Sequence, residues 1–204
     1  MNWFDVTLFG SSFVTLFVIM DPPGIIPLYL SFTGGRPKAV RKRMAWQAAT
    51  VAFCVISVFG LFGQTILDYL HVSIPALKVS GGLLLLLVAL QLLTGQAEEP
   101  TENKEVNVAL VPLGTPLLAG PGAIVAAIVS VQKAHTGAEY LAVWSAIVAI
   151  HVVLWLTMRF SLGIIRVIKE SGVVLVTRLS GLLLSAIAVQ LVADGVRGFI
   201  EATP

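Results

Sequence analysis

The stretch "VIMDPPGIIPLYL" (Val18–Leu30) interrupts a run that is otherwise apolar enough to cross a membrane. A proline removes a backbone donor and clashes with the carbonyl one turn earlier. It also disfavours helical geometry at the residue before it. Pro22 and Pro23 therefore predict a break in the helix, and Gly24 makes local unwinding easy. Asp21 is the only charged residue in this run, and a carboxylate at such a depth needs water, a partner or a ligand.

The composition places the chain in a lipid bilayer. Of its 204 residues 57% are hydrophobic and 12% are charged, and the mean hydropathy is +0.93, whereas about 25% of residues are charged in soluble domains. No basic run is interleaved with aromatic residues, as nucleic-acid binding would require. Cys54 is the only cysteine, which excludes a disulfide framework and a cysteine-based metal site. We therefore expect a multi-pass protein of the cell (inner or plasma) membrane.

Six charge-poor runs are long enough to cross the bilayer as helices. A crossing needs roughly 20 apolar residues, and strands exposed to lipid would leave their backbone groups unbonded. The first and fourth runs exceed this length, and both carry proline and glycine near their centres. We predict an all-α fold with transmembrane helices at Val6–Gly35, Met44–Leu67, Val79–Ala97, Val106–Gln132, Tyr140–Met158 and Ser171–Ala193.

The basic residues predict the orientation of these helices. With the N-terminus outside, only Lys78, Lys133 and Arg197 of the 13 basic residues fall on the outer side. Because lysine and arginine gather on the cytoplasmic side of membrane proteins, we expect both termini to be extracytoplasmic. The residues then placed on the cytoplasmic side are Arg36, Lys38, Arg41, Lys42, Arg43, Lys104, Arg159, Arg166, Lys169 and Arg178.

The two halves of the chain resemble each other. "KVSGGLL" (Lys78–Leu84) matches "RLSGLLL" (Arg178–Leu184) at an offset of 100 residues. Earlier elements match at an offset of 98 residues, which aligns Trp46 with Trp144. The glycines Gly81, Gly82 and Gly181 within these matches favour close approach of helices.

Each half carries three crossings, so the second half must enter the membrane from the opposite side. We therefore predict two inverted three-helix repeats, residues 1–96 and 106–204, joined by an acidic cytoplasmic linker at 97–105 within one membrane domain. Many secondary transporters share this architecture, in which one half rocks against the other around a central site.

The fourth helix carries a second predicted break, "PLLAGPGAI" (Pro116–Ile124), in which Pro121-Gly122 aligns with Pro23-Gly24. After each break a new half-helix begins, and its first amides have no partner within the helix. These amides also carry the positive end of the helix dipole. Two such ends near the midplane would bind an anion without a basic side chain. Small residues, among them Thr115 and Gly120, leave room for a modest cavity.

Asp21 adds a negative charge to this arrangement. One interpretation is that it caps the second half-helix, because aspartate is a good N-cap. The other is a direct role in binding substrate or an ion, and the two are compatible. Unpaired amides together with a carboxylate suit a zwitterion, with the ligand's ammonium at Asp21 or at a freed carbonyl. The site therefore favours a small neutral amino acid.

The two motifs, with the "SG" pairs that open the third and sixth helices, resemble the MarC family of six-helix membrane proteins over essentially the whole chain. The resemblance implies kinship with amino-acid exporters of the LysE type and, for some members, transport of glycine and alanine. The second break has Ala119 where the first has Asp21, so only one carboxylate is expected. The functional positions implied by the resemblance are Asp21, Pro22, Gly24, Pro27, Gly120, Pro121 and Gly122.

Other polar residues inside the predicted spans are candidates for lining the site. Ser80, Ser180 and Gln190 either face the site or hydrogen-bond between helices. His151 aligns with Phe53 at the offset of 98 residues, and it either relays protons or has a structural role.

No HExxH, P-loop or paired-aspartate motif is present, so we expect neither an enzyme nor a bound cofactor or metal. The predicted function is a secondary transporter of a small neutral amino acid that works by alternating access. The alternatives are a passive channel or facilitator and an exporter of another small metabolite. The coupling ion, H⁺ or Na⁺, stays open, as does a homo-oligomeric state; the expected partners are the substrate and the lipid bilayer.

Overall fold

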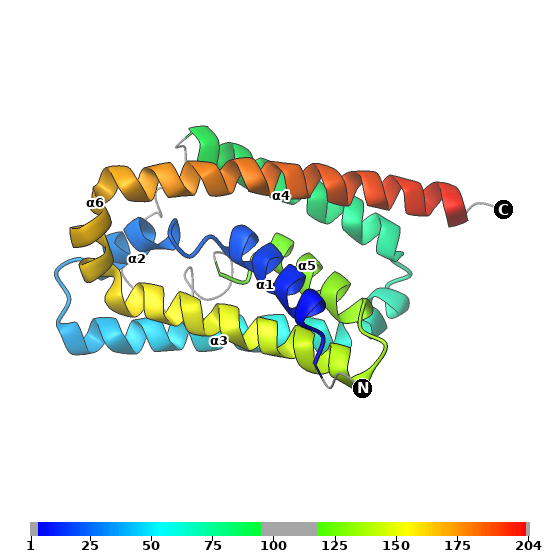
Figure 1. Ribbon diagram of the computed structural model, residues 1–204, viewed down its shortest axis with the longest axis horizontal. Helices are drawn as coiled ribbons and strands as arrows, with labels where there is room; N and C mark the ends of the chain where they lie inside the picture. Colours follow the sequence, from blue (N-terminus) through cyan, green and yellow to red (C-terminus); the bar gives the residue numbers. More distant parts are fainter. Residues whose placement is uncertain (1–3, 95–117, 203–204) are drawn as a thin grey trace.

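The computed structural model describes residues 4–94 and 118–202, and this part of the chain is helical without strands. The acidic linker 97–105, Thr115 and the first part of the predicted fourth crossing lie outside the described residues. The helices are α1 (Val6–Met20), α2 (Ile25–Thr33), α3 (Lys38–Tyr69), α4 (Ile74–Thr94), α5 (Pro121–Gln132) and α6 (Gly137–Ala202) (Figure 1).

Helices α1 and α2 together form the first crossing. The 15 residues of α1 extend roughly 22 Å at 1.5 Å per residue, which is less than the hydrocarbon thickness of about 30 Å. The nine residues of α2 continue in the same direction after the break. Helix α5 is also too short to cross alone. Helix α2 begins directly after Pro23-Gly24, and α5 begins at Pro121-Gly122, so both begin at the proline-glycine motifs, as the sequence predicts.

Helix α6 contains two crossings. Lys169 has non-helical dihedrals (φ 61°, ψ 164°) and bends the chain back on itself. The two resulting apolar segments, hereafter the first arm (Gly137–Val167) and the second arm (Val174–Glu201), are each long enough to cross a membrane, as are α3 and α4. The first arm continues past Met158, where the predicted fifth helix ends.

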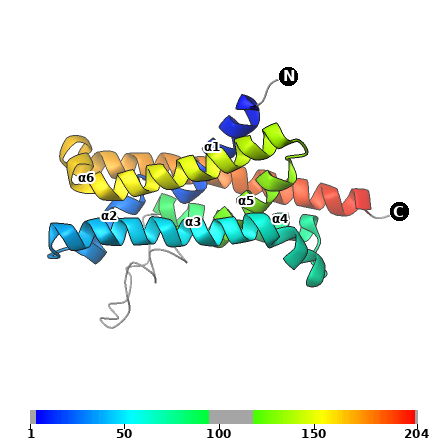
Figure 2. The same cartoon turned by 90° about the horizontal axis from the view of Figure 1, so that it is seen from below.

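The long helices lie side by side along the longest axis of the molecule, and the short helices lie among them. The first arm of α6 runs along α3, and the second arm runs along α4 (Figures 1 and 2). Helix α5 contacts α1, α3, α4 and α6, so the half-helix after the second break is central. Helix α1 begins and the second arm ends toward the same end of the bundle (Figure 1), as expected for an even number of crossings.

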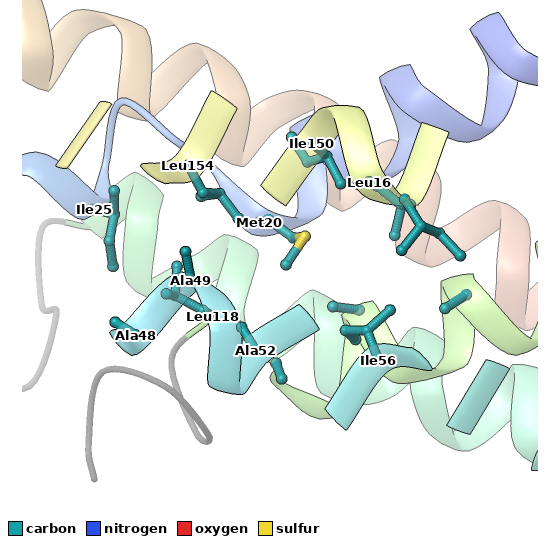
Figure 3. Close-up of a cluster of buried hydrophobic side chains, with 14 of the residues drawn as sticks. Leu16, Met20, Ile25, Ala48, Ala49, Ala52, Ile56, Leu118, Ile150 and Leu154 are labelled. Atoms are coloured by element: carbon teal, nitrogen blue, oxygen red, sulfur yellow. The ribbon is translucent and has the colours of Figure 1, made fainter. Parts of the chain in front are cut away.

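Small side chains make up much of the interior. On α3 the buried stripe includes Ala45, Ala48, Ala49 and Ala52, which recur at helical spacing. Figure 3 shows Ala48, Ala49 and Ala52 in the core cluster. Elsewhere on α3, large apolar side chains such as Trp46 and Phe62 are exposed. Helices in lipid gain little from burying apolar area against each other, so close backbone approach between small residues holds them together.

Glycines set the contact between α4 and the second arm. A Cβ at Gly82 would lie 2.7 Å from the carbonyl oxygen of Ala188, and a Cβ at Gly181 would lie 3.3 Å from that of Ala89. A Cβ at Gly195, near the end of the second arm, would lie 2.8 Å from the carbonyl oxygen of Pro75, near the start of α4. These pairs require the two helices to be antiparallel and in close contact, which confirms the role expected of Gly82 and Gly181.

We expect Gly82→Ala to destabilise the protein, because the added methyl group meets backbone, which cannot rotate away. Overpacking of this kind costs about 1–3 kcal/mol. Gly10→Ala is the matched control: Gly10 also lies within a helix, but nothing lies within 4 Å of its added Cβ, and alanine favours a helix by up to about 1 kcal/mol. In detergent, Gly82→Ala should melt below the wild type and Gly10→Ala at or above it. A Gly82→Ala protein as stable as the wild type would contradict this packing.

Candidate functional site

The first break separates α1 from α2 at Asp21–Gly24. The Asp21 amide donates to the Phe17 carbonyl at 3.0 Å and closes α1. Asp21 itself adopts left-handed dihedrals (φ 40°, ψ 66°), which are uncommon outside glycine, although aspartate and asparagine tolerate them best. The two prolines then carry the chain away from the axis of α1. The conformation agrees with the break that the sequence predicts.

The prolines also leave carbonyl oxygens of α1 without their helical partners. Continuing the helix would require Pro22 to donate to Val18 and Pro23 to donate to Ile19, and neither proline has an N–H group. These acceptors lie at the C-terminal end of α1, where the helix dipole is negative. The break therefore presents oxygen atoms to any cation or donor that reaches it.

The amides of the first turn of α2 are largely used within the break. The Ile25 amide donates to the Asp21 carbonyl at 3.1 Å, and the Ile26 amide donates to the Pro23 carbonyl at 3.2 Å. We expected these amides to be unpaired and available to an anion. They are satisfied locally because the chain turns tightly enough for the new helix to bond to the residues of the break. The first break therefore offers a ligand more carbonyl acceptors, at the end of α1, than free amide donors, at the start of α2.

The Asp21 carboxylate is buried and unpaired. Its residue is 6% exposed, and neither carboxylate oxygen has a hydrogen-bond partner. The Ser180 hydroxyl and the Gly24 amide lie close enough to act on its charge, but neither meets hydrogen-bond geometry. The N-cap of α2 is Gly24, with no side-chain cap. Of the two interpretations of Asp21, the one in which it caps the second half-helix is therefore wrong: Asp21 occupies the C-cap of α1 instead.

Two hydroxyl groups from the second arm complete the surroundings of Asp21. A Cβ at Gly24 would overlap the Asp21 carboxylate, and it would lie 3.2 Å from the Thr177 hydroxyl oxygen. Thr177 and Ser180 are three residues apart on one helix and so share a face. Ser180 is among the lining residues predicted from the sequence, whereas Thr177 is not. The spacing from Ser180 would have identified it once that face was known to meet the first break.

An apolar cavity of about 210 Å³ lies beside the first break. Drug-sized ligands occupy pockets of roughly 300–1,000 Å³, so this volume suits a smaller molecule. Among its lining side chains only Thr157 carries a polar group. The lining residues are Phe17, Pro22, Pro23 and Ile26 from the break and its flanks, and Val153, Thr157, Ile164 and Val176 from α6.

The start of α5 and the turn before it meet the first break in the core. Gly120 is extended (φ −65°, ψ 165°), and α5 begins at Pro121 without a side-chain cap. Leu118 and Ala119 are buried in the same cluster as Met20 and Ile25, which flank the first break (Figure 3). A Cβ at Gly122 would overlap Leu85 of α4, so close packing there requires glycine. The predicted positions of the second break thus lie at the start of a central helix.

Two of the candidate lining residues are not brought to the breaks. Ser80 is exposed, and its hydroxyl donates to the Leu77 carbonyl of its own helix at 3.1 Å. Gln190 is also exposed, and its amide nitrogen donates to Asp194 Oδ1 at 2.8 Å. Ser180, by contrast, is 8% exposed and adjacent to Asp21. Of the three, Ser180 is the one that belongs to the candidate site.

His151 lies where α3 and the first arm of α6 meet. It is 5% exposed, and its Nδ1 is 2.7 Å from the Ile147 carbonyl oxygen, while Nε2 has no partner. Its ring meets that of Phe53 edge to face, with 5.4 Å between centroids. The sequence match at an offset of 98 residues pairs these same two positions. A contact between equivalent residues is expected where a two-fold axis passes between them.

Comparison with known proteins agrees with the resemblance seen in the motifs. The family model described as "MarC family integral membrane protein" matches residues 6–200. The UPF0056 membrane protein MJ1677 of Methanocaldococcus jannaschii is 35% identical, with 95% of this chain and 98% of that protein covered. The UPF0056 membrane protein YhcE of Escherichia coli is 29% identical (97% and 95% covered). YvbG of Bacillus subtilis is 32% identical (91% and 92% covered). No solved structure matches the chain.

Both breaks and nearly all of the described helices fall within the matched range, which extends over almost the full length of the chain. A match of this extent, with relatives above 30% identity that are covered almost end to end, is sufficient to assign the family. The chain belongs to the MarC family of integral membrane proteins.

Proposed function

We propose that this protein is a secondary transporter that moves a small neutral amino acid across the membrane by alternating access. The observation that carries the proposal is the unpaired, buried carboxylate of Asp21 at a break in a transmembrane helix. A buried carboxylate without a partner is costly in a membrane and marks a substrate or ion pathway. Broken helices at the interface of two repeats are the usual place for such a site in transporters.

Contacts between the halves support an inverted repeat. The second arm of α6 packs antiparallel against α4, its counterpart at the offset of 100 residues. The first arm packs against α3, where His151 meets its counterpart Phe53. Helices related by a two-fold axis in the membrane plane run in opposite directions and touch where the axis passes between them. This arrangement lets the two halves rock about a fixed central site.

The two breaks suit the two ends of a zwitterion. The start of α5, which no described side chain caps, offers the positive end of a helix to the carboxylate of an amino acid. The C-terminal end of α1, with the carbonyls of Val18 and Ile19 and the Asp21 carboxylate, attracts the ammonium group. The 210 Å³ cavity beside the break accepts a short aliphatic side chain. These three features together favour glycine, alanine or a similar substrate.

Replacing Asp21 with asparagine should impair transport more than stability. Asparagine keeps the size of the side chain and tolerates left-handed dihedrals, but it removes the charge. A charge-assisted hydrogen bond contributes roughly 1.5–3 kcal/mol, which corresponds to about ten- to a hundred-fold in affinity. Uptake and exchange of radiolabelled alanine in proteoliposomes measure the first effect, and the melting temperature measures the second.

Asp21→Asn vesicles that take up alanine like the wild type would overturn the role of this carboxylate. Exchange distinguishes a transporter from the alternative, a passive channel or facilitator. In a transporter, unlabelled alanine outside the vesicles accelerates the efflux of labelled alanine, whereas in a passive facilitator it does not.

Gly24→Ala should also impair transport, for a steric reason. The backbone of Gly24 (φ −67°, ψ −22°) is one that alanine adopts readily, so the helix start should survive. The new methyl group, however, occupies the position of the Asp21 carboxylate and forces it to turn away. We expect alanine uptake to fall at least tenfold with little change in the circular dichroism spectrum. Gly10→Ala is again the control, and equal uptake by the two variants would contradict the geometry of the site.

A further inference from the structure

The polar side of the first break is separate from the apolar cavity. The Asp21 carboxylate and the Thr177 hydroxyl lie beside Gly24, and the Ser180 hydroxyl lies close to the carboxylate, whereas the cavity is lined almost wholly by apolar side chains. The C-terminal carbonyls of α1, freed by the two prolines, belong to the same break. The first break thus gathers several oxygen atoms around one buried negative charge.

This negative charge has no counterpart in the described part of the chain. No described basic side chain pairs with Asp21, and its two oxygens lack any hydrogen-bond partner. The negative end of the α1 dipole adds to the charge of the carboxylate rather than offsetting it. The surroundings therefore favour a bound cation.

We propose that the Asp21 carboxylate and the hydroxyls of Ser180 and Thr177 bind a sodium ion, with a freed carbonyl of Val18 or Ile19 as a further ligand. Hard cations prefer carboxylate, hydroxyl and carbonyl oxygens. A single carboxylate neutralises a monovalent ion, whereas a divalent ion would leave a net positive charge buried in the membrane. Unwound backbone and half-helix C-terminal ends coordinate sodium in other broken-helix transporters.

The site joins the two halves of the molecule. Asp21 belongs to the first crossing, and Ser180 and Thr177 belong to the last, so an ion between them holds the first break against the second arm. The ion would also hold Asp21 in its left-handed conformation. Sodium at this position organises the break that flanks the cavity, so the inference rests on the proposed function and deepens it. Sodium is the coupling ion of the same site and occupies the Asp21 carboxylate, and the substrate's ammonium group binds at the carbonyl of Val18 or Ile19 that sodium leaves free.

The test is a thermal melt of the purified full-length protein in detergent, titrated with sodium chloride at an ionic strength held constant with choline chloride. A ligand that binds only the folded state raises the melting temperature with its concentration. We expect a rise with sodium chloride and a smaller one with potassium chloride. In Asp21→Asn the rise should be lost, and in Ser180→Ala and Thr177→Val the sodium concentration for a half-maximal rise should increase at least tenfold.

Ser185→Ala is the matched control, because its hydroxyl lies on the same arm but donates to the Leu182 carbonyl at 2.7 Å. It should respond to sodium like the wild type. A melting temperature independent of sodium, or the same sodium response in Asp21→Asn, overturns the site.

Alanine uptake with and without a sodium gradient separates this inference from the proposed function. Stimulation by the gradient supports both. If alanine exchange and the melting temperature are both independent of sodium, the sodium site is overturned and the proposed transporter function is still supported. A sodium-dependent melting temperature that Asp21→Asn abolishes, in a protein that moves no amino acid, supports the sodium site and overturns the proposed substrate.

Discussion

A backbone carbonyl inside a bilayer has no water to bond, so a helix that stops there must have its open acceptors satisfied by something else. Pro22 and Pro23 create this situation in the first crossing, because they cannot donate to the carbonyls at the end of α1. The break, the left-handed Asp21 and the turn into α2 all follow from that constraint. The unpaired acceptors and the carboxylate give the centre of the protein its negative character.

The packing of the other helices keeps this break buried. Helix α5, which starts at the second proline-glycine motif, contacts four other helices, and its first turn packs against α4 at Gly122. Alanines on α3 and glycines on α4 and the second arm let the backbones approach. Apolar burial against lipid supplies little driving force between helices, so close steric fit determines where the arms of α6 lie.

Several features were predictable because they depend on local chemistry. The positions of the crossings follow from hydropathy, and the start of α5 follows from Pro121, whose missing N–H is not needed at the first position of a helix. Other features were not predictable. One of the two interpretations of Asp21 has its carboxylate accept amides of α2, but the Ile25 and Ile26 amides bond to carbonyls of the break, and this depends on how tightly the chain turns. Ser80 and Ser180 are equivalent by sequence, yet only Ser180 faces the break.

The sequence alone therefore predicts a membrane protein whose first and fourth crossings are interrupted at proline-glycine motifs, because proline chemistry and hydropathy act over a few residues. The hydroxyl groups near Asp21 come from Thr177 and Ser180, which lie 156 and 159 positions away in the sequence. Only the packing of the second arm against the first crossing brings these hydroxyls to the carboxylate. Helical periodicity and helix propensity in the sequence place a residue on one face of a helix. The rotation of that helix about its axis depends on the helices packed against it. For the second arm, the close glycine contacts with α4 determine this rotation.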